Sequence, residues 1–287
     1  MDSVSIVRDS SLTGSDIVGD LRLDWSVYSD VGRVRDANED AALVLPGRYL
    51  LADGMGGHES GELASEAALL TLAEVEPGAE LADTRDVLDR LLVDAQQRIG
   101  GIDGFSDRRA GTTVTGAVLV TDEDVLHWLI LNIGDSRTYR FQNGTLQLLT
   151  RDHSQVQEFV DAGVITAEQA RIDPRRNVIT RALGAGMSEP DADYFSTPAL
   201  PGDVLLICSD GLTGELPDAE IAEILAGSDS AEDAAASLVD AALFVGAHDN
   251  VTVVVVSVRS DEESGEVDGE SGELDGESVE TSEDTPT

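Results

Sequence analysis

Acidic residues stand at the beginning or end of several apolar, strand-like stretches of this chain. In the clearest case, an apolar run over residues 49–52 leads directly into Asp53 and a glycine-rich turn. The acidic residues in comparable positions are Glu39, Asp40, Asp53, Asp135, Asp210 and Asp249. Carboxylate and backbone carbonyl oxygens are the ligands that hard divalent cations prefer. Because acids so far apart in sequence can meet only if their strands end at one edge of a shared sandwich, the sequence predicts a divalent-metal site at that edge.

The turn after Asp53 suits a metal site as well as a simple turn. Gly54, Gly56 and Gly57 can adopt a positive φ angle and let a ligand approach the backbone closely. A single Asp-Gly pair after a strand is more often only a turn. The recurrence of the pattern, with Asp-Gly again at Asp210, favours the metal-site interpretation.

Hydrophobic patterns indicate the elements that must position these acids. Strands are predicted over residues 21–29, 41–45, 48–52, 112–120, 125–133, 138–142, 146–149, 204–209 and 251–258. Helices are predicted over residues 60–75, 84–99, 155–162, 167–171, 218–225 and 231–244. Hairpins with helix pairs inserted between them favour two packed sheets covered by helices over a parallel doubly wound sheet. Residues 152–180 interrupt the strand pattern and are expected to form a flap over one edge.

We expect one folded domain over residues 21–259, since a chain of 287 residues can bury a substantial core. Residues 1–20 are rich in Ser and Asp and weakly patterned, so they are expected to form a mobile lead-in. Residues 260–287 repeat Gly-Glu and Asp-Gly-Glu units without positions for a core, which predicts an acidic disordered tail.

The net charge of −39 is extreme, and all 18 basic residues are Arg. Residues 260–287 hold 12 acidic and no basic residues, so residues 1–259 still carry −27 of the −39. We interpret this acidity as adaptation to a salt-rich interior, that is, a halophilic protein, because salt screens self-repulsion. A nucleic-acid partner is not expected, because phosphate binding requires a basic patch.

Cys208 is the single cysteine, which excludes a disulfide framework and a thiolate metal site. It lies inside a predicted strand, so we expect a buried thiol and not a nucleophile. No apolar run approaches the length of a membrane span, about 18 residues, and no signal-peptide pattern begins the chain. We therefore expect a cytoplasmic protein with no membrane partner.

Seven short motifs follow one another along the chain. They are RDANED at residues 35–40, DGMGG at 53–57, GTT at 111–113, GDSR at 134–137, TRALG at 180–184, SDGL at 209–212 and DNVT at 249–252. Together they resemble the metal-dependent protein serine/threonine phosphatases of type 2C, in their bacterial and archaeal form. The resemblance covers the folded region and implies an α+β fold, a four-layer α-β-β-α sandwich of two antiparallel sheets flanked by helices.

The resemblance also implies a reaction. Members of this family hydrolyse phosphoserine and phosphothreonine by attack of a water or hydroxide that bridges two Mn²⁺ or Mg²⁺ ions, without a phosphoenzyme. The implied partners are phosphorylated proteins, the products of serine/threonine kinases, and the expected oligomeric state is a monomer. The alternative is a catalytically inactive phosphoprotein-binding regulatory module of the same fold. The intact acidic set argues against it.

Individual roles follow from the same resemblance. Asp53 is expected to bridge the two ions, with the Gly54 carbonyl as a further ligand. Asp210 and Asp249 are expected at one ion, Glu39 and Asp40 at the other, directly or through water, and Asp135 with Asp210 at a weaker third ion. Arg35 is the expected catalytic phosphate clamp, since a guanidinium holds two phosphate oxygens at once. Asn250 is expected to orient Asp249. For each acid and for Arg35, the alternative is an ordinary surface or capping side chain without a role in the site.

One departure concerns the proton donor to the leaving group. Met55 stands where eukaryotic relatives have the histidine proposed as general acid. His58 lies three residues further on and is a candidate substrate contact, although an exposed loop histidine is an equal alternative. A metal-bound water is the other candidate for the acid. His153, Arg137 and Arg181 are expected to be structural.

Overall fold

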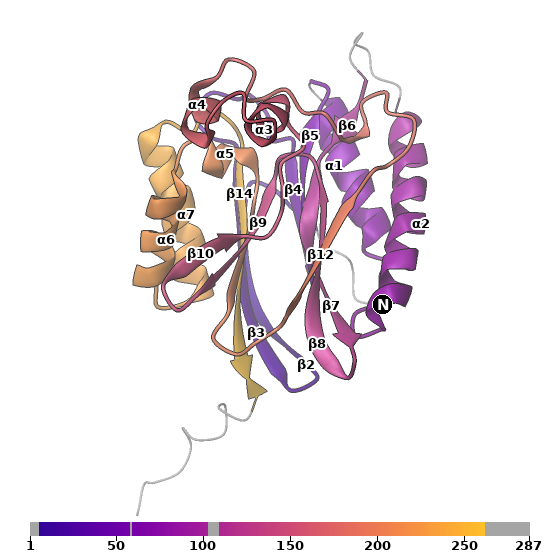
Figure 1. Ribbon diagram of the computed structural model, residues 1–287, viewed down its shortest axis with the longest axis vertical. Helices are drawn as coiled ribbons and strands as arrows, with labels where there is room; N and C mark the ends of the chain where they lie inside the picture. The colour runs from indigo at the N-terminus through magenta and orange to yellow at the C-terminus, as the bar shows by residue number, and fades with distance from the viewer. Residues whose placement is uncertain (1–5, 58, 103–108, 262–287) are drawn as a thin grey trace, which may run out of the picture.

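The structure is a computed structural model that describes residues 6–57, 59–102 and 109–261. Its strands form two antiparallel sheets that face each other (Figure 1). The eight-stranded sheet runs in the order β1 (Ile6–Val7), β4 (Asp40–Leu45), β5 (Arg48–Met55), β7 (Val114–Asp122), β8 (Val125–Ile133), β12 (Asp193–Pro198). Off this path, β6 (Gly111–Thr112) pairs with β5, and β11 (Leu183–Gly184) pairs with β6. The six-stranded sheet runs β10 (Thr145–Leu148), β9 (Arg137–Gln142), β13 (Val204–Cys208), β14 (Val251–Ser260), β3 (Leu21–Asp30), β2 (Ser11–Val18).

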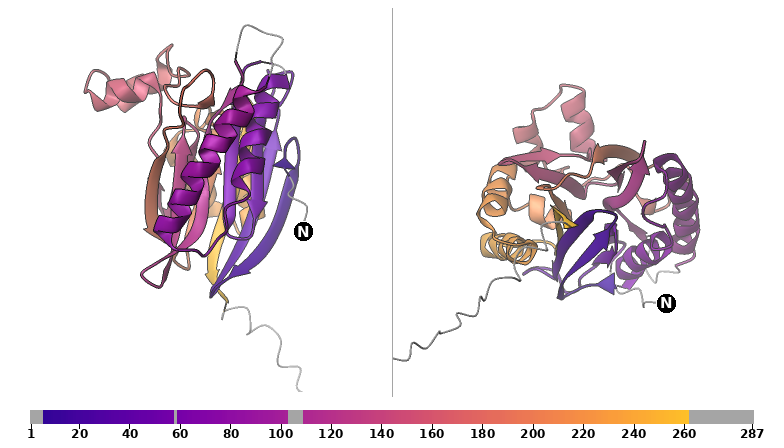
Figure 2. Two further views of the ribbon diagram at one scale, coloured as in Figure 1. Left: turned by 90° about the vertical axis from the view of Figure 1, so that its right-hand side faces the viewer. Right: turned by 90° about the horizontal axis from the view of Figure 1, so that it is seen from below.

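Helices cover the outer face of each sheet. The helices α1 (Glu59–Leu72) and α2 (Leu81–Gly100) lie on the eight-stranded sheet. The helices α5 (Asp210–Thr213), α6 (Asp218–Gly227) and α7 (Ala231–Val245) lie on the six-stranded sheet. Figure 2 shows the two helical layers on opposite sides of the paired sheets. The predicted four-layer α-β-β-α sandwich is therefore confirmed.

Three apolar layers hold the sandwich together. One lies under α1 and α2 and contains Leu50 and Leu69. The middle layer lies between the sheets, where Tyr49 and Trp128 meet edge to face at 5.9 Å. The third lies under α7. Because β5, β13 and β14 are covered on both faces, their sequences are continuous apolar runs that do not alternate.

The N-terminal segment differs from the expectation. Residues 6–7 form β1 and residues 11–18 form β2, and β2 pairs with β3 along its whole length. A lead-in detached from the fold is therefore wrong from Ile6 onward. The strands were missed because β2 is an edge strand whose side chains are mostly exposed, so it shows little of the apolar alternation that marks a half-buried strand.

The strand β12 was also missed, because its side chains are only partly buried and Pro198 ends it. At the other end of the chain, β14 continues to Ser260, and the expected disordered tail lies outside the described residues from 262 onward. Cys208 is fully buried in β13, and burial raises the pKa of its thiol, as expected for a core residue. None of the helices in the described ranges combines the length and the hydropathy that a membrane span requires.

The interrupting segment, residues 152–180, forms α3 (Gln155–Asp161) and α4 (Ala167–Ile172). Ser154 and Thr166 cap these two helices by accepting hydrogen bonds from backbone N–H groups, which explains why such short helices begin where they do. Figure 2 shows the pair projecting from one end of the sandwich. The segment that interrupts the strand pattern is thus a helical pair, and its expected role as a mobile flap stays a prediction.

Candidate metal-binding active site

The six acidic residues singled out from the sequence gather at one end of the sandwich, close enough for their charges to act on one another. Asp53 lies near the end of β5, Asp40 begins β4, and Asp210 begins α5 directly after β13. The other three are Glu39 just before β4, Asp135 between β8 and β9, and Asp249 just before β14. Both sheets therefore contribute acids to a common edge, as the spacing predicted.

Asp40 and Asp53 face each other directly across β4 and β5. Like charges in directly opposed cross-strand positions are destabilising. Burial, together with the nearby charges of Asp210 and Asp249, raises the pKa of Asp40 to about 7, even though Ser209 and Thr252 donate hydrogen bonds to it. Burial and the charge of Asp40 also raise the pKa of Asp53 well above its ordinary value. The pair is not stable as two adjacent carboxylates without a compensating cation.

Asp210 and Asp135 are subject to the same repulsion. Burial and the charge of Asp249 raise the pKa of Asp210 to about 6, against the opposing effects of Arg35 and of a hydrogen bond with Asp53. Burial and the charge of Asp210 raise the pKa of Asp135 well above the usual range. Perturbed carboxylates concentrated at one place are typical of functional sites.

The donor set fits hard divalent cations. Glu39 Oε1 and Asp40 Oδ2 are buried and have no hydrogen-bond partner, so each offers a free lone pair. Within the described ranges, no three acidic, His or Cys side chains converge closely enough to enclose an ion by themselves. Mg²⁺ is commonly bound by one or two carboxylates and keeps several waters, so the arrangement suits this class of ion and not a closed zinc site.

Position 54 requires a glycine because the neighbouring backbone leaves no room for a Cβ atom. A Cβ at this position would collide with the Gly61 carbonyl and lie 2.6 Å from the Glu39 carbonyl oxygen. The positive φ expected for the turn occurs instead at Gly56 and Gly57. Gly54 therefore keeps the backbone next to Asp53 within reach of the Glu39 loop.

Asn250 fastens the loop over residues 31–39 to the start of β14. Its side-chain nitrogen donates to the carbonyls of Val31 (2.9 Å) and Ala37 (3.0 Å), and its side-chain oxygen accepts from the Glu39 N–H (2.9 Å). Its backbone N–H donates to Asp249 Oδ1 at 2.9 Å. The side chain thus positions Glu39, while the backbone of the same residue orients Asp249.

Arg35 lies on that loop and reaches the site. Its Nη2 donates to Asp249 Oδ2 at 2.6 Å, and its side chain is 49% exposed. The exposed part of the guanidinium is open to solvent, so a ligand can reach it. The structure places the predicted phosphate clamp at the carboxylate edge, next to an expected metal ligand.

Two threonines with no role assigned from the sequence hold Asp53 in place. Thr113 Oγ1 accepts from the Asp53 N–H at 3.0 Å, and Thr112 Oγ1 donates to the Asp53 carbonyl at 2.9 Å. Thr113 Oγ1 also lies 2.8 Å from Ser136 Oγ, beside Asp135. The GTT motif was a signal for these residues, but their contacts depend on strand pairing that spacing does not reveal.

The remaining candidates divide into structural and undescribed residues. Arg137 forms a two-pronged ion pair with Asp152 at 2.9 and 2.7 Å, and Arg181 pairs with Asp193 at 3.0 Å, as expected of structural arginines. His153 is buried and accepts from the Gly134 N–H, and burial lowers its pKa. His58 lies outside the described residues.

A cleft of about 430 Å³ opens beside the carboxylates. Asp135 and Asp210 line one part of it, and residues of α3, α4 and the turn after α4 line another. Arg171 and Arg176 contribute basic side chains to this lining. The helical pair thus forms a wall of the space that leads to the acidic edge.

Comparison with known proteins identifies the family. A sequence profile described as protein phosphatase 2C matches residues 33–243, well over half of the chain. The chain therefore belongs to the protein phosphatase 2C family, which confirms the resemblance carried by the seven motifs.

Named relatives agree with this assignment. Serine/threonine phosphatase stp of Listeria welshimeri is 35% identical over 246 residues, which cover 79% of this chain and 93% of the relative. Serine/threonine protein phosphatase PstP of Mycobacterium tuberculosis is 39% identical over 245 residues, which cover 83% of this chain and 45% of PstP.

Solved structures have the same fold. A crystal structure of Mycobacterium tuberculosis PstP/Ppp matches with a TM-score of 0.74 at 35% identity, covering 83% of this chain and 99% of that chain. The serine/threonine phosphatase of S. agalactiae matches with a TM-score of 0.75 at 32% identity, covering 82% of this chain and 99% of that chain. The catalytic domain of PstP in complex with two manganese ions matches with a TM-score of 0.70 at 34% identity, covering 84% of this chain and 100% of that chain.

Proposed function

We propose that this chain is a metal-dependent phosphatase that hydrolyses phosphoserine and phosphothreonine in proteins. The observation that carries this proposal is the convergence of six acidic side chains from both sheets, two of them with buried unpaired oxygens, in a member of the protein phosphatase 2C family. An inactive binding module would not need to preserve carboxylates whose mutual repulsion destabilises the fold.

The proposed cofactor is a pair of Mn²⁺ or Mg²⁺ ions, with a third, weaker ion. The proposed ligands are Glu39, Asp40, Asp53, the Gly54 carbonyl, Asp135, Asp210 and Asp249. Asp53, at the end of the central strand β5, would face both ions, while Asp210 with Asp249 and Glu39 with Asp40 would serve one each, the latter pair directly or through water. When bound, such ions lower the pKa of water to near neutrality and offset charge on the phosphoryl group. The solved PstP domain with two manganese ions supports the ion count.

Arg35 is the proposed phosphate-binding residue. Its guanidinium already contacts Asp249, so a cation at Asp249 would free the guanidinium to hold two phosphate oxygens. The backbone N–H of Asn250 would keep Asp249 oriented while this exchange takes place. The proposed general acid for the leaving serine or threonine is His58 or a bound water.

The cleft next to Asp135 and Asp210 is the proposed path for the substrate polypeptide. Among the described residues, neither Arg171 nor Arg176 forms an ion pair, although both line the cleft of a strongly acidic protein. Their positive charge would attract the negative charge of a phosphorylated polypeptide. We further propose that the substrates are products of serine/threonine kinases, that the enzyme acts as a cytoplasmic monomer, and that nucleic acid and membranes are not partners.

Phosphate release from matched peptides tests the proposal. The protein is incubated with phosphoserine, phosphothreonine and phosphotyrosine peptides of one sequence, in Mn²⁺ or in excess chelator. We expect Mn²⁺-dependent hydrolysis of the first two and at least about tenfold slower hydrolysis of the third. Absence of hydrolysis by a folded, Mn²⁺-binding protein would favour the binding-module alternative.

A further inference from the structure

The N-terminal segment crosses from one sheet to the other at the carboxylate end of the sandwich. The strand β1 pairs with β4 in the eight-stranded sheet, with Val7 opposite Ala42. Four residues later, β2 pairs with β3 in the six-stranded sheet, with Ser11 opposite Tyr28. The crossing residues 8–10 therefore lie beside the beginning of β4, where Glu39 and Asp40 stand.

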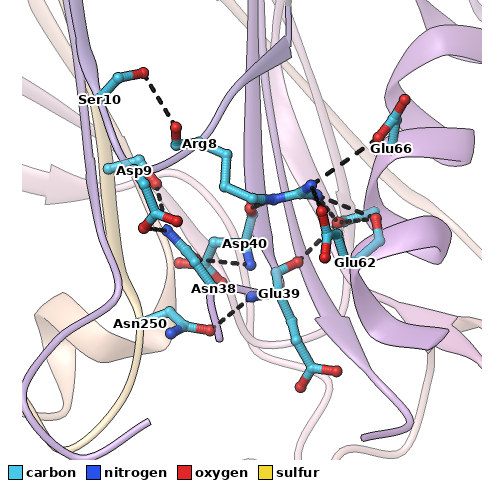
Figure 3. A network of polar contacts seen from close by, with 11 residues as sticks. Arg8, Asp9, Ser10, Asn38, Glu39, Asp40, Glu62, Glu66 and Asn250 are labelled. Atoms are coloured by element: carbon cyan, nitrogen blue, oxygen red, sulfur yellow. Dashed lines mark hydrogen bonds and ion pairs between the residues drawn. The ribbon is translucent and has the colours of Figure 1, made fainter. Parts of the chain in front are cut away.

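Arg8 makes the principal contacts of this crossing. Its side chain is only 14% exposed, and its Nε donates to the Asp40 carbonyl at 2.8 Å. Its Nη1 donates to Glu62 Oε1 at 2.8 Å, and its Nη2 donates to the Glu62 carbonyl at 3.1 Å and to Ser65 Oγ at 3.0 Å. One planar guanidinium thus joins β4 to helix α1 (Figure 3).

The Arg8 contacts continue to the backbone of Glu39. Ser65 Oγ, which accepts from Arg8, donates to the Glu39 carbonyl at 2.7 Å. The Gly54 N–H donates to the same carbonyl at 3.2 Å. On the other side, the Glu39 N–H donates to Asn250 Oδ1.

Asp40 is held in a similar way by the crossing segment. Its carbonyl accepts from Arg8, and its N–H donates to Asn38 Oδ1 at 3.1 Å. The Asn38 side chain in turn donates to Asp9 Oδ1 at 2.8 Å. Both backbone polar groups of Asp40 are therefore fixed, the carbonyl directly by Arg8 and the N–H through Asn38, whose side chain is held by Asp9.

The two residues fixed in this manner are the ones whose carboxylates leave buried oxygens without a partner, Glu39 Oε1 and Asp40 Oδ2. Figure 3 shows the Glu39 carboxylate pointing away from Arg8, so the guanidinium does not neutralise it. Arg8 acts on the backbone and leaves the side-chain oxygens available. The contacts hold ligand atoms in position without competing for the cation.

We propose that Arg8 is a positioning residue that holds the backbone of Glu39 and Asp40 in the geometry required for divalent-metal binding. This inference rests on the metal site proposed above. Residue 8 lies ahead of the stretch matched by the family profile, which begins at residue 33. The N-terminal strands thereby gain a function beyond closing the sheet edges.

Mn²⁺ titration calorimetry on metal-free protein tests the proposal, with wild type, Arg8→Ala, Arg8→Lys and Arg22→Ala compared. Residues that orient metal ligands typically contribute about 10–100-fold to metal affinity, so we expect Arg8→Ala to weaken Mn²⁺ binding by about tenfold or more. A Lys, with one point charge in place of a planar fork, should restore only part of the loss. Arg22 pairs with Asp24 at the far end of β3, so Arg22→Ala removes the same charge without touching the site and should bind Mn²⁺ like wild type.

The sign of the effect separates positioning from simple electrostatics. If Arg8 acted only as a nearby positive charge, its removal would strengthen cation binding. If Arg8 acts through its hydrogen bonds to the Asp40 carbonyl and to Ser65 Oγ, its removal weakens cation binding. At saturating Mn²⁺, kcat and KM for p-nitrophenyl phosphate should recover to within about twofold of wild type, since only binding of the ion is impaired.

A second variant covers the case in which Arg8→Ala does not fold. Ser65→Ala keeps Arg8 and removes only the hydroxyl that links it to the Glu39 carbonyl, and it should weaken Mn²⁺ binding in the same direction by a smaller factor. Wild-type affinity in every folded variant of Arg8 and Ser65 would overturn the inference and leave the proposed function standing. Failure of the wild-type protein to bind Mn²⁺ would instead overturn the proposed function, and this inference with it.

Discussion

Asp40 and Asp53 lie opposite each other in neighbouring strands, and neither has a basic partner among the described residues. Buried carboxylates in such a position either retain a proton or bind a cation. The raised pKa values of Asp40, Asp53, Asp135 and Asp210 describe the first state. A divalent cation would replace those protons, and its charge would offset the repulsion between the carboxylates that bind it.

Arg35 provides the prediction at the scale of single residues. Arg35→Ala should lower kcat/KM for a phosphopeptide about 10–100-fold, the value of one charge-assisted contact of roughly 1.5–3 kcal/mol. Mn²⁺ affinity should not fall, because Arg35 pairs with Asp249 and so competes with the cation. Steady-state kinetics and Mn²⁺ titration measure the two effects separately.

Arg33 supplies a matched control for this experiment. It lies on the same loop, and its Nε donates to the Leu243 carbonyl at 2.7 Å, away from the carboxylates. Arg33→Ala should therefore leave kcat/KM close to wild type. Unchanged efficiency in Arg35→Ala would remove Arg35 from the proposed phosphate contact.

Residue types and motif order were enough to predict which acids gather, because each stands at the beginning or the end of an apolar stretch. They were not enough to predict the contacts that hold these acids. Arg8 lies in a segment whose composition indicated a lead-in, and Ser65 is an ordinary residue of a helix. Contacts of this kind depend on strand register and on the packing of α1 against β4, which hydrophobic patterns do not specify.

At the scale of elements, the loop over residues 31–39 depends on Asn250. Asn250→Ala leaves the Glu39 N–H and the carbonyls of Val31 and Ala37 without their partner. Val31 and Glu39 are half-buried and Ala37 is exposed, so water replaces part of the lost bonding, and each lost hydrogen bond costs about 0.5–1.5 kcal/mol. We expect the free energy of unfolding to fall by about 2 kcal/mol and Mn²⁺ affinity to fall about tenfold. Chemical denaturation and calorimetry measure both changes.

Gln97→Ala is a suitable comparison, since it removes an exposed amide on α2. It should change neither quantity. If Asn250→Ala lowered stability while Mn²⁺ affinity stayed at the wild-type value, the loop would be structural only, and its role in positioning Glu39 would be wrong.

Most elements were predicted because their patterns are strong. The predicted strand over residues 125–133 coincides with β8, and the Asn143–Gly144 turn has the two positive φ angles that its sequence indicates. The edge strands β2 and β12 were missed for the opposite reason, since partial exposure removes the apolar alternation. The cross-connection from β1 to β2 could not be predicted from a pattern at all.

At the scale of the whole molecule, the acidic edge should make stability depend on pH when no metal is bound. Because the folded-state pKa values of Asp40 and Asp210 are raised to about 7 and about 6, the folded state holds protons that the unfolded state has already released. Stability is then highest below pH 4 as far as these groups are concerned, and it falls as the pH rises from about 4 to about 7. In chelator, the melting temperature should fall across this pH range by about 2–4 °C for each kcal/mol lost from the free energy of unfolding. Added Mn²⁺ should restore the melting temperature at pH 7.5.

Asp40→Asn is the control, because general repulsion in a chain of net charge −39 also grows with pH. The variant should show a shallower slope than wild type in chelator and a smaller gain from Mn²⁺. Equal slopes in the two proteins would show that the carboxylate edge is not the source of the pH dependence. The halophilic interpretation stays a prediction, to be examined in the same proteins by repeating the melts in molar salt.

The central claim is that the carboxylate edge binds the ions that make this chain a phosphatase, and Asp210→Asn tests it most directly. Phosphopeptide hydrolysis by wild type and by the variant is measured with and without Mn²⁺, at low and at molar salt. We predict that wild-type activity requires Mn²⁺ and that the variant loses at least about a hundredfold in kcat/KM while remaining folded. Equal activity in the two proteins, or wild-type activity that persists in chelator, would contradict the account.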